Sequence, residues 1–191
     1  MRRLLAVVLW LVATPASAEP APAFDLVAAA RSQVGVTLVY DPSYQRIAYP
    51  MGDVAPERGV CSDVVIRAFR AVGIDLQQEV HRDMAQHFAA YPQIWGLSAP
   101  DSNIDHRRVP NLATWFERRA YAVPVSREPA AYQPGDVVSW VLDSGQPHIG
   151  IVSDRRSEDG VRPLVIHNIG WGAQEEDVLF EYRITGHFRV S

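Results

Sequence analysis

The single cysteine of this 191-residue chain, Cys61, is the side chain best suited to nucleophilic chemistry. One cysteine cannot form an internal disulfide, so Cys61 is either buried and inert or retained for its reactivity. It follows Gly59 and Val60 at the start of a predicted helix, where unpaired N–H groups and the helix dipole favour a thiolate. The same N–H groups can later bind an oxyanion. This position indicates a nucleophile.

A thiol nucleophile needs a base, and the base needs a third group that fixes its tautomer. The best candidates among six histidines are His148 and His167, which lie in two successive predicted strands. An antiparallel hairpin would place their imidazoles opposite each other, or one diagonal step apart, on one face. Gly150 lies on the face of His148 and leaves room for another group. We therefore expect His148 within hydrogen-bonding reach of Cys61, oriented by His167; the alternative is two structural histidines.

Further polar residues are candidates for substrate binding. Asp63 lies two residues after Cys61, and its charge raises the thiol pKa unless it is turned away or paired. The alternative for Asp63 is a first-turn acid that suits the helix dipole. His106, Arg107 and Arg108 form a polar cluster whose guanidinium groups can bind substrate carboxylates. The alternative for this cluster is a solvated loop.

The composition excludes several functions. The chain has no Lys, which rules out Schiff-base chemistry, a Ser-Lys dyad and a P-loop lysine. Its 18 basic and 22 acidic residues give a net charge of -4 without a basic run, so nucleic acid is not an expected partner. The expected mechanism needs no metal or organic cofactor. A zinc hydrolase using His148, His167 and Asp63 or Asp154 stays open, although no H-E-x-x-H motif supports it.

The N-terminus has the features of a secretory signal peptide over residues 1–18. Two arginines precede the apolar run Leu4–Val12, and Ala16-Ser17-Ala18 is a small-residue cleavage site. The run is shorter than the roughly 20 residues that span a bilayer. We expect an exported protein, periplasmic or secreted, without stable membrane insertion, in which residues 19–191 form one domain; an uncleaved anchor is the alternative.

The elements that must position these residues follow from apolar periodicity. Helices are predicted over Phe24–Val34, Val60–Val72, Gln77–Ala90 and Leu112–Arg119, the last with Asn111 as its cap. Strands are predicted over Asp136–Leu142, His148–Ser153, Leu164–Ile169, Val178–Tyr182 and Ile184–Val190. Helices followed by a meander of strands indicate the α+β class with an antiparallel sheet.

Several motifs resemble those of NlpC-type, papain-like cysteine peptidases and amidases. Gly59-Val60-Cys61-Ser62-Asp63 is similar to their nucleophile turn D-C-S-G, and His148-Ile149-Gly150-Ile151 matches their base motif H-[VI]-G-[IV]. Ile166-His167 matches their third-residue motif, and the resemblance extends from Leu26 to Asn168. It implies a papain-like α+β domain with N-terminal helices packed on an antiparallel sheet meander. It also implies hydrolysis of peptidoglycan peptides, or another acyl or amide substrate, through a thioester.

Longer runs resemble the bacterial YijF-like family of unknown function. They are Tyr49–Val54, Gly59–Arg67, Asn103–Leu112 and Ile166–Gly170. Two positions depart from the NlpC-type pattern, because Val60 stands where Asp is usual and Asp63 where Gly is usual. The oxyanion Tyr of that pattern falls on Leu38, so Tyr40 or Tyr49 is the expected substitute in the substrate pocket.

Two other functions remain open. Relatives of this fold act on lipid as acyl hydrolases or transferases, often with the His before the Cys, and the order here argues mildly against that. A catalytically inactive wall-binding module is the second alternative, suggested by Asp63 and the missing family Tyr.

Overall fold

The computed structural model describes residues 23–190, so the predicted signal peptide lies outside the described residues. The helices are α1 (Ala23–Arg31), α2 (Cys61–Ala71), α3 (Leu76–His87) and α4 (Val109–Arg118), with the short 3-10 helices η1 (Phe88–Ala90), η2 (Asp105–Arg107) and η3 (Pro129–Ala131). The strands are β1 (Val39–Tyr40), β2 (Arg58–Gly59), β3 (Val137–Val141), β4 (Pro147–Arg156), β5 (Pro163–Asn168), β6 (Ala173–Glu176) and β7 (Arg183–Phe188). Within the described residues, no helix is both long and apolar enough to cross a membrane.

Five strands form one antiparallel sheet in the order β6-β5-β4-β3-β7, and β1 and β2 form a separate parallel pair. Strands β3, β4 and β5 form the predicted meander, and β6 extends it at a position where no strand is predicted. The predicted C-terminal strand is β7, which returns to the opposite edge beside β3. The predicted strand over Val178–Tyr182 is wrong. Leu179 is fully buried against the sheet there, and its carbonyl accepts a hydrogen bond from Trp140 Nε1 at 3.0 Å.

Helix α2 is the central element of the helical half. It begins with a capping interaction, in which the Asp63 carboxylate accepts a hydrogen bond from the Val60 N–H at 2.6 Å. Its apolar face packs on β4 and β5, while α1 packs against both α2 and β4. Helix α4 begins at Val109, earlier than predicted, and Asn111 does not cap it, because Asn111 Nδ2 donates to the Asp105 carbonyl at 3.0 Å.

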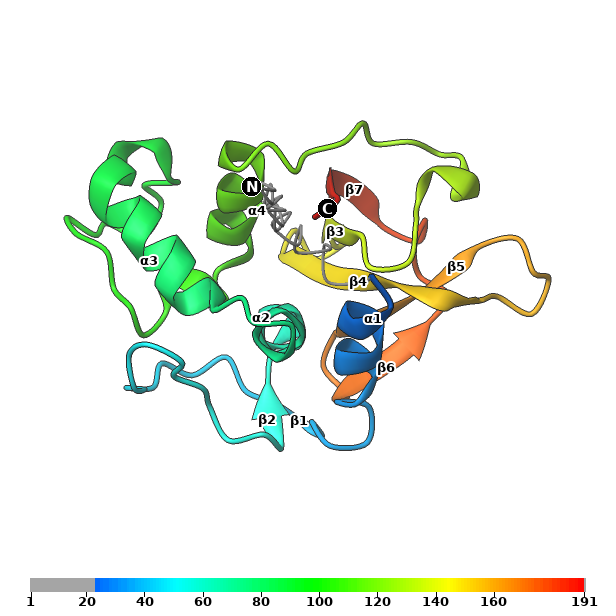
Figure 1. The fold of residues 1–191 in the computed structure, drawn as a ribbon, viewed down its shortest axis with the longest axis horizontal. Helices are drawn as coiled ribbons and strands as arrows, with labels where there is room; N and C mark the ends of the chain where they lie inside the picture. Colours follow the sequence, from blue (N-terminus) through cyan, green and yellow to red (C-terminus); the bar gives the residue numbers. More distant parts are fainter. Residues whose placement is uncertain (1–22, 191) are drawn as a thin grey trace, which may run out of the picture.

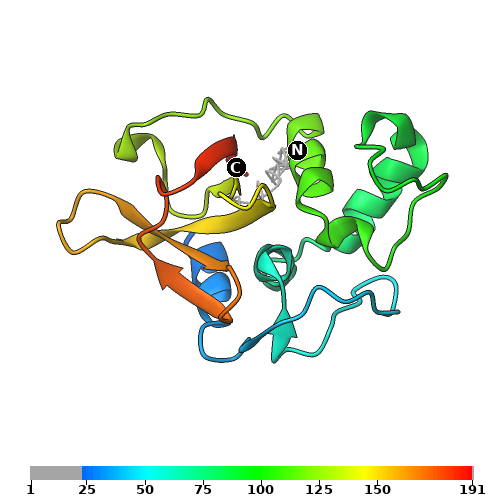
Figure 2. The same ribbon diagram turned by 180° about the vertical axis from the view of Figure 1, so that it is seen from behind.

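The two faces of the sheet pack against different clusters. Ile149, Ile151 and Ile166 face the helices and join the main core, which also contains Cys61. Alternate residues on the other face join a second cluster around Trp140. In both views the sheet lies at one end of the molecule, α3 lies at the other, and α2 and α4 lie between them (Figures 1 and 2). The predicted α+β class is confirmed, with the Cys-bearing helix preceding the His-bearing strands as in the papain-like order.

Candidate active site

Cys61 is the first residue of α2, is 4% exposed, and contributes to the wall of a cavity of about 260 Å³. The other lining residues are Tyr40, Pro42, Val60, Trp95, Ile104, Arg107, Arg108, Val109, Pro110 and Pro147. Their side chains are mostly apolar, and they come from β1, the loops before η2, the start of α4 and the start of β4. The cavity is close to the lower end of the volumes that bind small molecules or short segments of chain.

The thiol of Cys61 is neutral in this environment. Burial raises its pKa to about 12, and the charge of Asp63 acts in the same direction. Hydrogen bonds from the backbone N–H groups of Ile149 and Ser62 lower the pKa but do not outweigh burial. The helix start favours a thiolate, as expected, but removal of the sulfur from water outweighs this effect and keeps the pKa of the Cys61 thiol high.

The two predicted histidines are in contact. Nε2 of His148 and Nδ1 of His167 are 2.9 Å apart, and the rings meet edge to face with their planes at 81°. Strands β4 and β5 pair with Ile151 opposite Ile166, which puts the two histidines one diagonal step apart, as predicted. A Cβ atom on Gly150 would lie 3.0 Å from Cβ of His167, so this close approach requires glycine.

Both imidazoles are buried and neutral. Burial, together with the neighbouring His167, lowers the pKa of His148 to about 3. Burial also lowers the pKa of His167, against the opposing effect of Glu176. Trp140 lies beside the His148 ring, with ring centroids 5.8 Å apart, and shields the pair from water. The resting site therefore combines a neutral thiol with neutral imidazoles.

The expected hydrogen bond between Cys61 and His148 is absent among residues 23–190. The backbone N–H of Ile149, the residue after His148, instead acts on the thiol and lowers its pKa. Strand alternation explains this difference. Ile149 points toward the core beneath α2, whereas His148 points toward Trp140 and the second cluster. The structure thus brings the sulfur to the strand that carries the candidate base, but not into contact with its ring.

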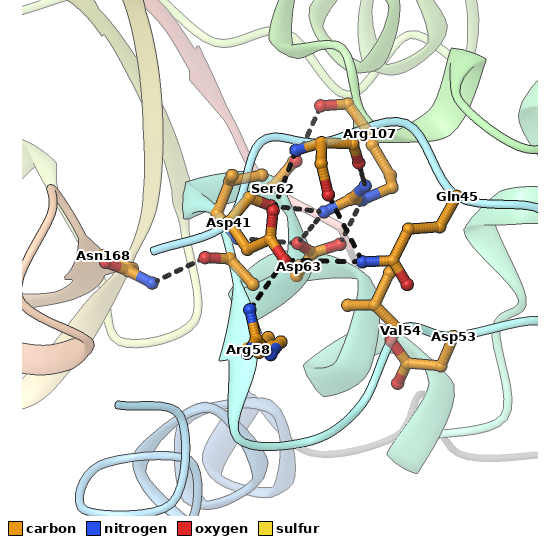
Figure 3. A network of polar contacts seen from close by, with 12 residues as sticks. Asp41, Gln45, Asp53, Val54, Arg58, Ser62, Asp63, Arg107 and Asn168 are labelled. Atoms are coloured by element: carbon orange, nitrogen blue, oxygen red, sulfur yellow. Dashed lines mark hydrogen bonds and ion pairs between the residues drawn. The ribbon is translucent and has the colours of Figure 1, made fainter. Parts of the chain in front are cut away.

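Two residues that the sequence did not suggest extend the site. Glu176 of β6 lies with Oε2 3.0 Å from Nε2 of His167. Asn168 donates through Nδ2 to the Gly59 carbonyl at 3.1 Å and so ties the end of β5 to the turn before Cys61 (Figure 3). The strand that carries Glu176 was not predicted, because Ala173–Glu176 is short and mostly polar.

Asp63 and Arg107 form a buried ion pair, not a substrate-binding surface. Arg107 Nε and Nη2 donate to the two Asp63 oxygens at 2.9 and 2.8 Å, and both side chains are less than 5% exposed (Figure 3). The guanidinium also donates to the carbonyls of Ser43 and Asp41 at 3.2 Å. The expected role of Asp63 in substrate binding is corrected, because Asp63 caps α2 and holds η2. Arg107 contributes to the cavity wall, with these donors engaged within the protein.

The remaining predicted binding residues separate into two groups. Tyr40 and Arg108 line the cavity beside Cys61. Burial raises the pKa of Tyr40 to about 12, and the charges of Cys61 and Asp63 add to this effect.

His106 and Tyr49 do not line this cavity, which corrects their expected role. His106 is 2% exposed, and burial lowers its pKa to about 4. Tyr49 is 43% exposed and packs its ring edge against His81.

The zinc alternative lacks a ligand set. No group of three or more His, Cys, Asp or Glu residues within 23–190 is arranged to hold a metal ion. Asp63 is paired with Arg107, and Asp154 is bonded to Arg31, so neither acid joins the histidines.

Known proteins resemble this chain in sequence and fold. The family described as "Domain of unknown function (DUF1287)" matches residues 27–190. The uncharacterized protein YijF of Escherichia coli (strain K12) is 64% identical over 160 residues, which cover 84% of this chain and 78% of that protein. The structures of NlpC1 and NlpC2 from Trichomonas vaginalis are each 15% identical, with TM-scores of 0.46 and 0.44. They cover 86% of this chain, which spans only 44% and 46% of theirs.

The match to the family and the identity to YijF confirm the resemblance to the YijF-like family. With 64% identity over most of both proteins and a family match over nearly all described residues, the chain belongs to the DUF1287 family.

Proposed function

We propose that this protein is an exported cysteine hydrolase that cleaves amide bonds in peptidoglycan peptides. One observation carries the proposal. A lone cysteine at a helix start lines a cavity and contacts the strand that bears a buried pair of hydrogen-bonded histidines. Burying two imidazoles costs free energy, because each loses its hydration. Buried titratable groups with shifted pKa values cluster at functional sites, so this pair indicates such a site.

The neutral resting state suits general-base catalysis. Nδ1 of His148 takes the proton from the Cys61 thiol as the sulfur electron pair attacks the substrate carbonyl carbon. The carbonyl π electrons move to oxygen, and collapse of this oxyanion breaks the C–N bond. The leaving nitrogen receives the proton from His148, and a thioester remains on Cys61. Water then loses a proton to Nδ1 of His148 and attacks the thioester carbon. The C–S bond breaks, the acyl group leaves as a carboxylic acid, and His148 returns the proton to the sulfur of Cys61.

The first proton transfer requires the thiol and the ring to approach each other. Ile149 lies on the Cys61 side of β4, whereas the His148 ring lies on the Trp140 side, so this step requires the start of β4 to rearrange when substrate binds. Hydrogen bonds of this kind are often loose without substrate and tighten in the bound complex. Bound substrate also displaces water from the cavity and strengthens the local electrostatics.

The cavity supplies groups for the developing oxyanion and for the substrate. The Cys61 backbone N–H lies at the helix start, and the Tyr40 hydroxyl is the second candidate donor. Arg108 stacks on Trp95 at 4.2 Å and donates to Asp105 at 3.0 Å, which leaves other guanidinium donors for a substrate carboxylate. Acidic peptide stems would provide such carboxylates next to the scissile amide.

The test is mass spectrometry of purified sacculi after incubation with wild-type protein or with Cys61→Ala. We expect new peptide fragments with the wild type and none with the variant, whose fold is checked by circular dichroism. A parallel incubation with phospholipid vesicles tests the lipid alternative. Release of fatty acid from the vesicles, without peptide fragments from the sacculi, would identify lipid as the substrate in place of peptidoglycan. Equal fragments from both proteins would contradict the nucleophilic role of Cys61.

One observation favours the catalytically inactive alternative. Cys61 is 4% exposed and its pKa is raised, as expected for a structural cysteine in an apolar core. The inactive module binds sacculi without releasing fragments, so a pull-down with sacculi, run beside the digestion, separates the two functions.

A further inference from the structure

Glu176 completes a line of polar side chains across three strands on one face of the sheet. His167 of β5 lies opposite Gln174 of β6, so Glu176 is one diagonal step from His167, on the side away from His148. The line therefore runs from His148 through His167 to Glu176, with contacts of 2.9 and 3.0 Å. The Glu176 side chain is 41% exposed, so the inner two members are buried and the outer one reaches solvent.

The acceptor at the end of this line determines the proton positions along it. A carboxylate only accepts hydrogen bonds, so Nε2 of His167 must carry a proton. A neutral His167 then has an unprotonated Nδ1, which accepts from Nε2–H of His148. The proton of His148 is thereby fixed on Nε2, and its Nδ1 keeps a free lone pair. No hydrogen bond to Nδ1 of His148 forms within the described residues.

We propose that Glu176 is a positioning residue that fixes the tautomers of both histidines and so keeps Nδ1 of His148 ready to accept the Cys61 proton. The inference rests on the proposed function only for the destination of that proton. Without Glu176, Nε2 of His167 would face water, and either tautomer of the pair would satisfy the same contact with His148.

Glu176 also supports the charged state that follows proton transfer. His148 becomes an imidazolium that still donates from Nε2 to His167, and the Glu176 charge partly compensates it through the line. The charged groups that act on the pair are Glu176 and Glu181. Glu175, the neighbour of Glu176, instead bonds Arg31 and Arg155.

The test is NMR of the imidazole nitrogens in protein labelled on histidine, at neutral pH. We expect the Nε2–H tautomer for both histidines in the wild type and a mixture of tautomers in Glu176→Ala. Glu176→Gln should restore the wild-type pattern, because its amide oxygen accepts the same hydrogen bond. It should also lower the pH at which His167 protonates, because the charge is gone.

Asp177→Asn is the matched control, since Asp177 is the next acidic residue and pairs only with Arg162 at the surface. Unchanged nitrogen shifts in Glu176→Ala would overturn the proposal. Where wall peptides are released, that release should fall on the order of 10-fold in Glu176→Ala and partly recover in Glu176→Gln. The tautomers are measured without substrate, so they decide the role of Glu176 even if the sacculi are not digested.

Discussion

At the scale of single residues, the site depends on a balance between burial and hydrogen bonding. Burial keeps the Cys61 thiol protonated and both imidazoles neutral, although each residue type is commonly charged in a catalytic pair. An ion pair of thiolate and imidazolium would face desolvation on both sides. In the proposed mechanism, the neutral groups separate charge only when a substrate carbonyl is present to accept the electron pair.

The first prediction concerns the reactivity of Cys61. Because burial raises the thiol pKa to about 12, iodoacetamide should label the native protein at pH 7 slower than the unfolded chain by on the order of 100-fold. Rates are followed by intact-mass spectrometry, with guanidinium-unfolded protein as the reference. Rapid native labelling at pH 6 would show an activated thiolate and contradict the neutral pair.

The second prediction separates structure from substrate binding at Arg107. Arg107→Ala leaves the Asp63 carboxylate buried without its partner, so the free energy of unfolding should fall by about 3–5 kcal/mol. Arg155→Ala removes an exposed arginine from Glu175 and should cost about 0–1 kcal/mol. Urea unfolding measures both. If Arg107→Ala lowered the free energy of unfolding by less than Arg155→Ala, the Asp63–Arg107 ion pair would not stabilise the fold.

At the scale of elements, the site depends on strand register. Pairing of β4, β5 and β6 puts three polar side chains on one diagonal, and a shift by one residue would turn each to the other face. Helix α2 approaches the same strands from the opposite face and delivers Cys61 at its first turn. The site therefore forms where the helix start meets the beginning of β4.

The third prediction tests the contact between β4 and β5. The added methyl group of Gly150→Ala would lie 2.8 Å from Val165 Cγ1, so the strands must separate. We expect a loss of about 1–3 kcal/mol in unfolding free energy and loss of wall-peptide release. Gly145→Ala is the control, since its positive φ of 82° costs about 1–2 kcal/mol with nothing nearby to clash. Equal peptide release by the two variants would show that the close approach of β4 and β5 at Gly150 is not needed for activity.

The spacing of apolar residues in the sequence predicted the helices and strands in which this spacing is regular. The helix that carries Cys61 and the hairpin that carries His148 and His167 were predicted to within a few residues, because apolar spacing and turn residues define them. The position of Glu176 could not be predicted, since its short strand is polar and forms through pairing with β5. The Asp63–Arg107 pair was missed because it joins residues far apart in sequence.

At the scale of the whole molecule, two layers of packing determine what the site can do. The helices cover one face of the sheet, and a cluster around Trp140 covers the other. Residues 148–153 of β4 are therefore buried on both faces of the strand, and the His148 ring lies on the face away from Cys61, which explains the absence of a bond between them. Motif order could not reveal this, because a motif specifies spacing and not the face to which a side chain turns.

The fourth prediction follows from the buried histidines. Burial holds the pKa of His148 at about 3 and of His106 at about 4, below the ordinary 6.5. Below pH 6.5 the unfolded chain binds protons that the folded protein does not, so the free energy of unfolding falls as the pH drops. Each histidine should contribute about 1–2 kcal/mol of this loss by pH 5, above the range where most carboxyl groups titrate.

Urea unfolding at pH 7 and pH 5 measures this dependence. His106→Gln removes one of the two groups and should reduce the loss of stability between the two pH values. An equal loss in the variant would mean that His106 protonates freely in the folded protein.

The most direct measurement is the rate of peptide release from sacculi by the wild type, Cys61→Ala, His148→Ala and the double variant. A thiol and its base act as one unit, so each single variant should fall to the same residual rate, and the double variant should be no slower. A folded His148→Ala protein that releases peptides at the wild-type rate would contradict the account, since the cysteine would then act without the imidazole beside it.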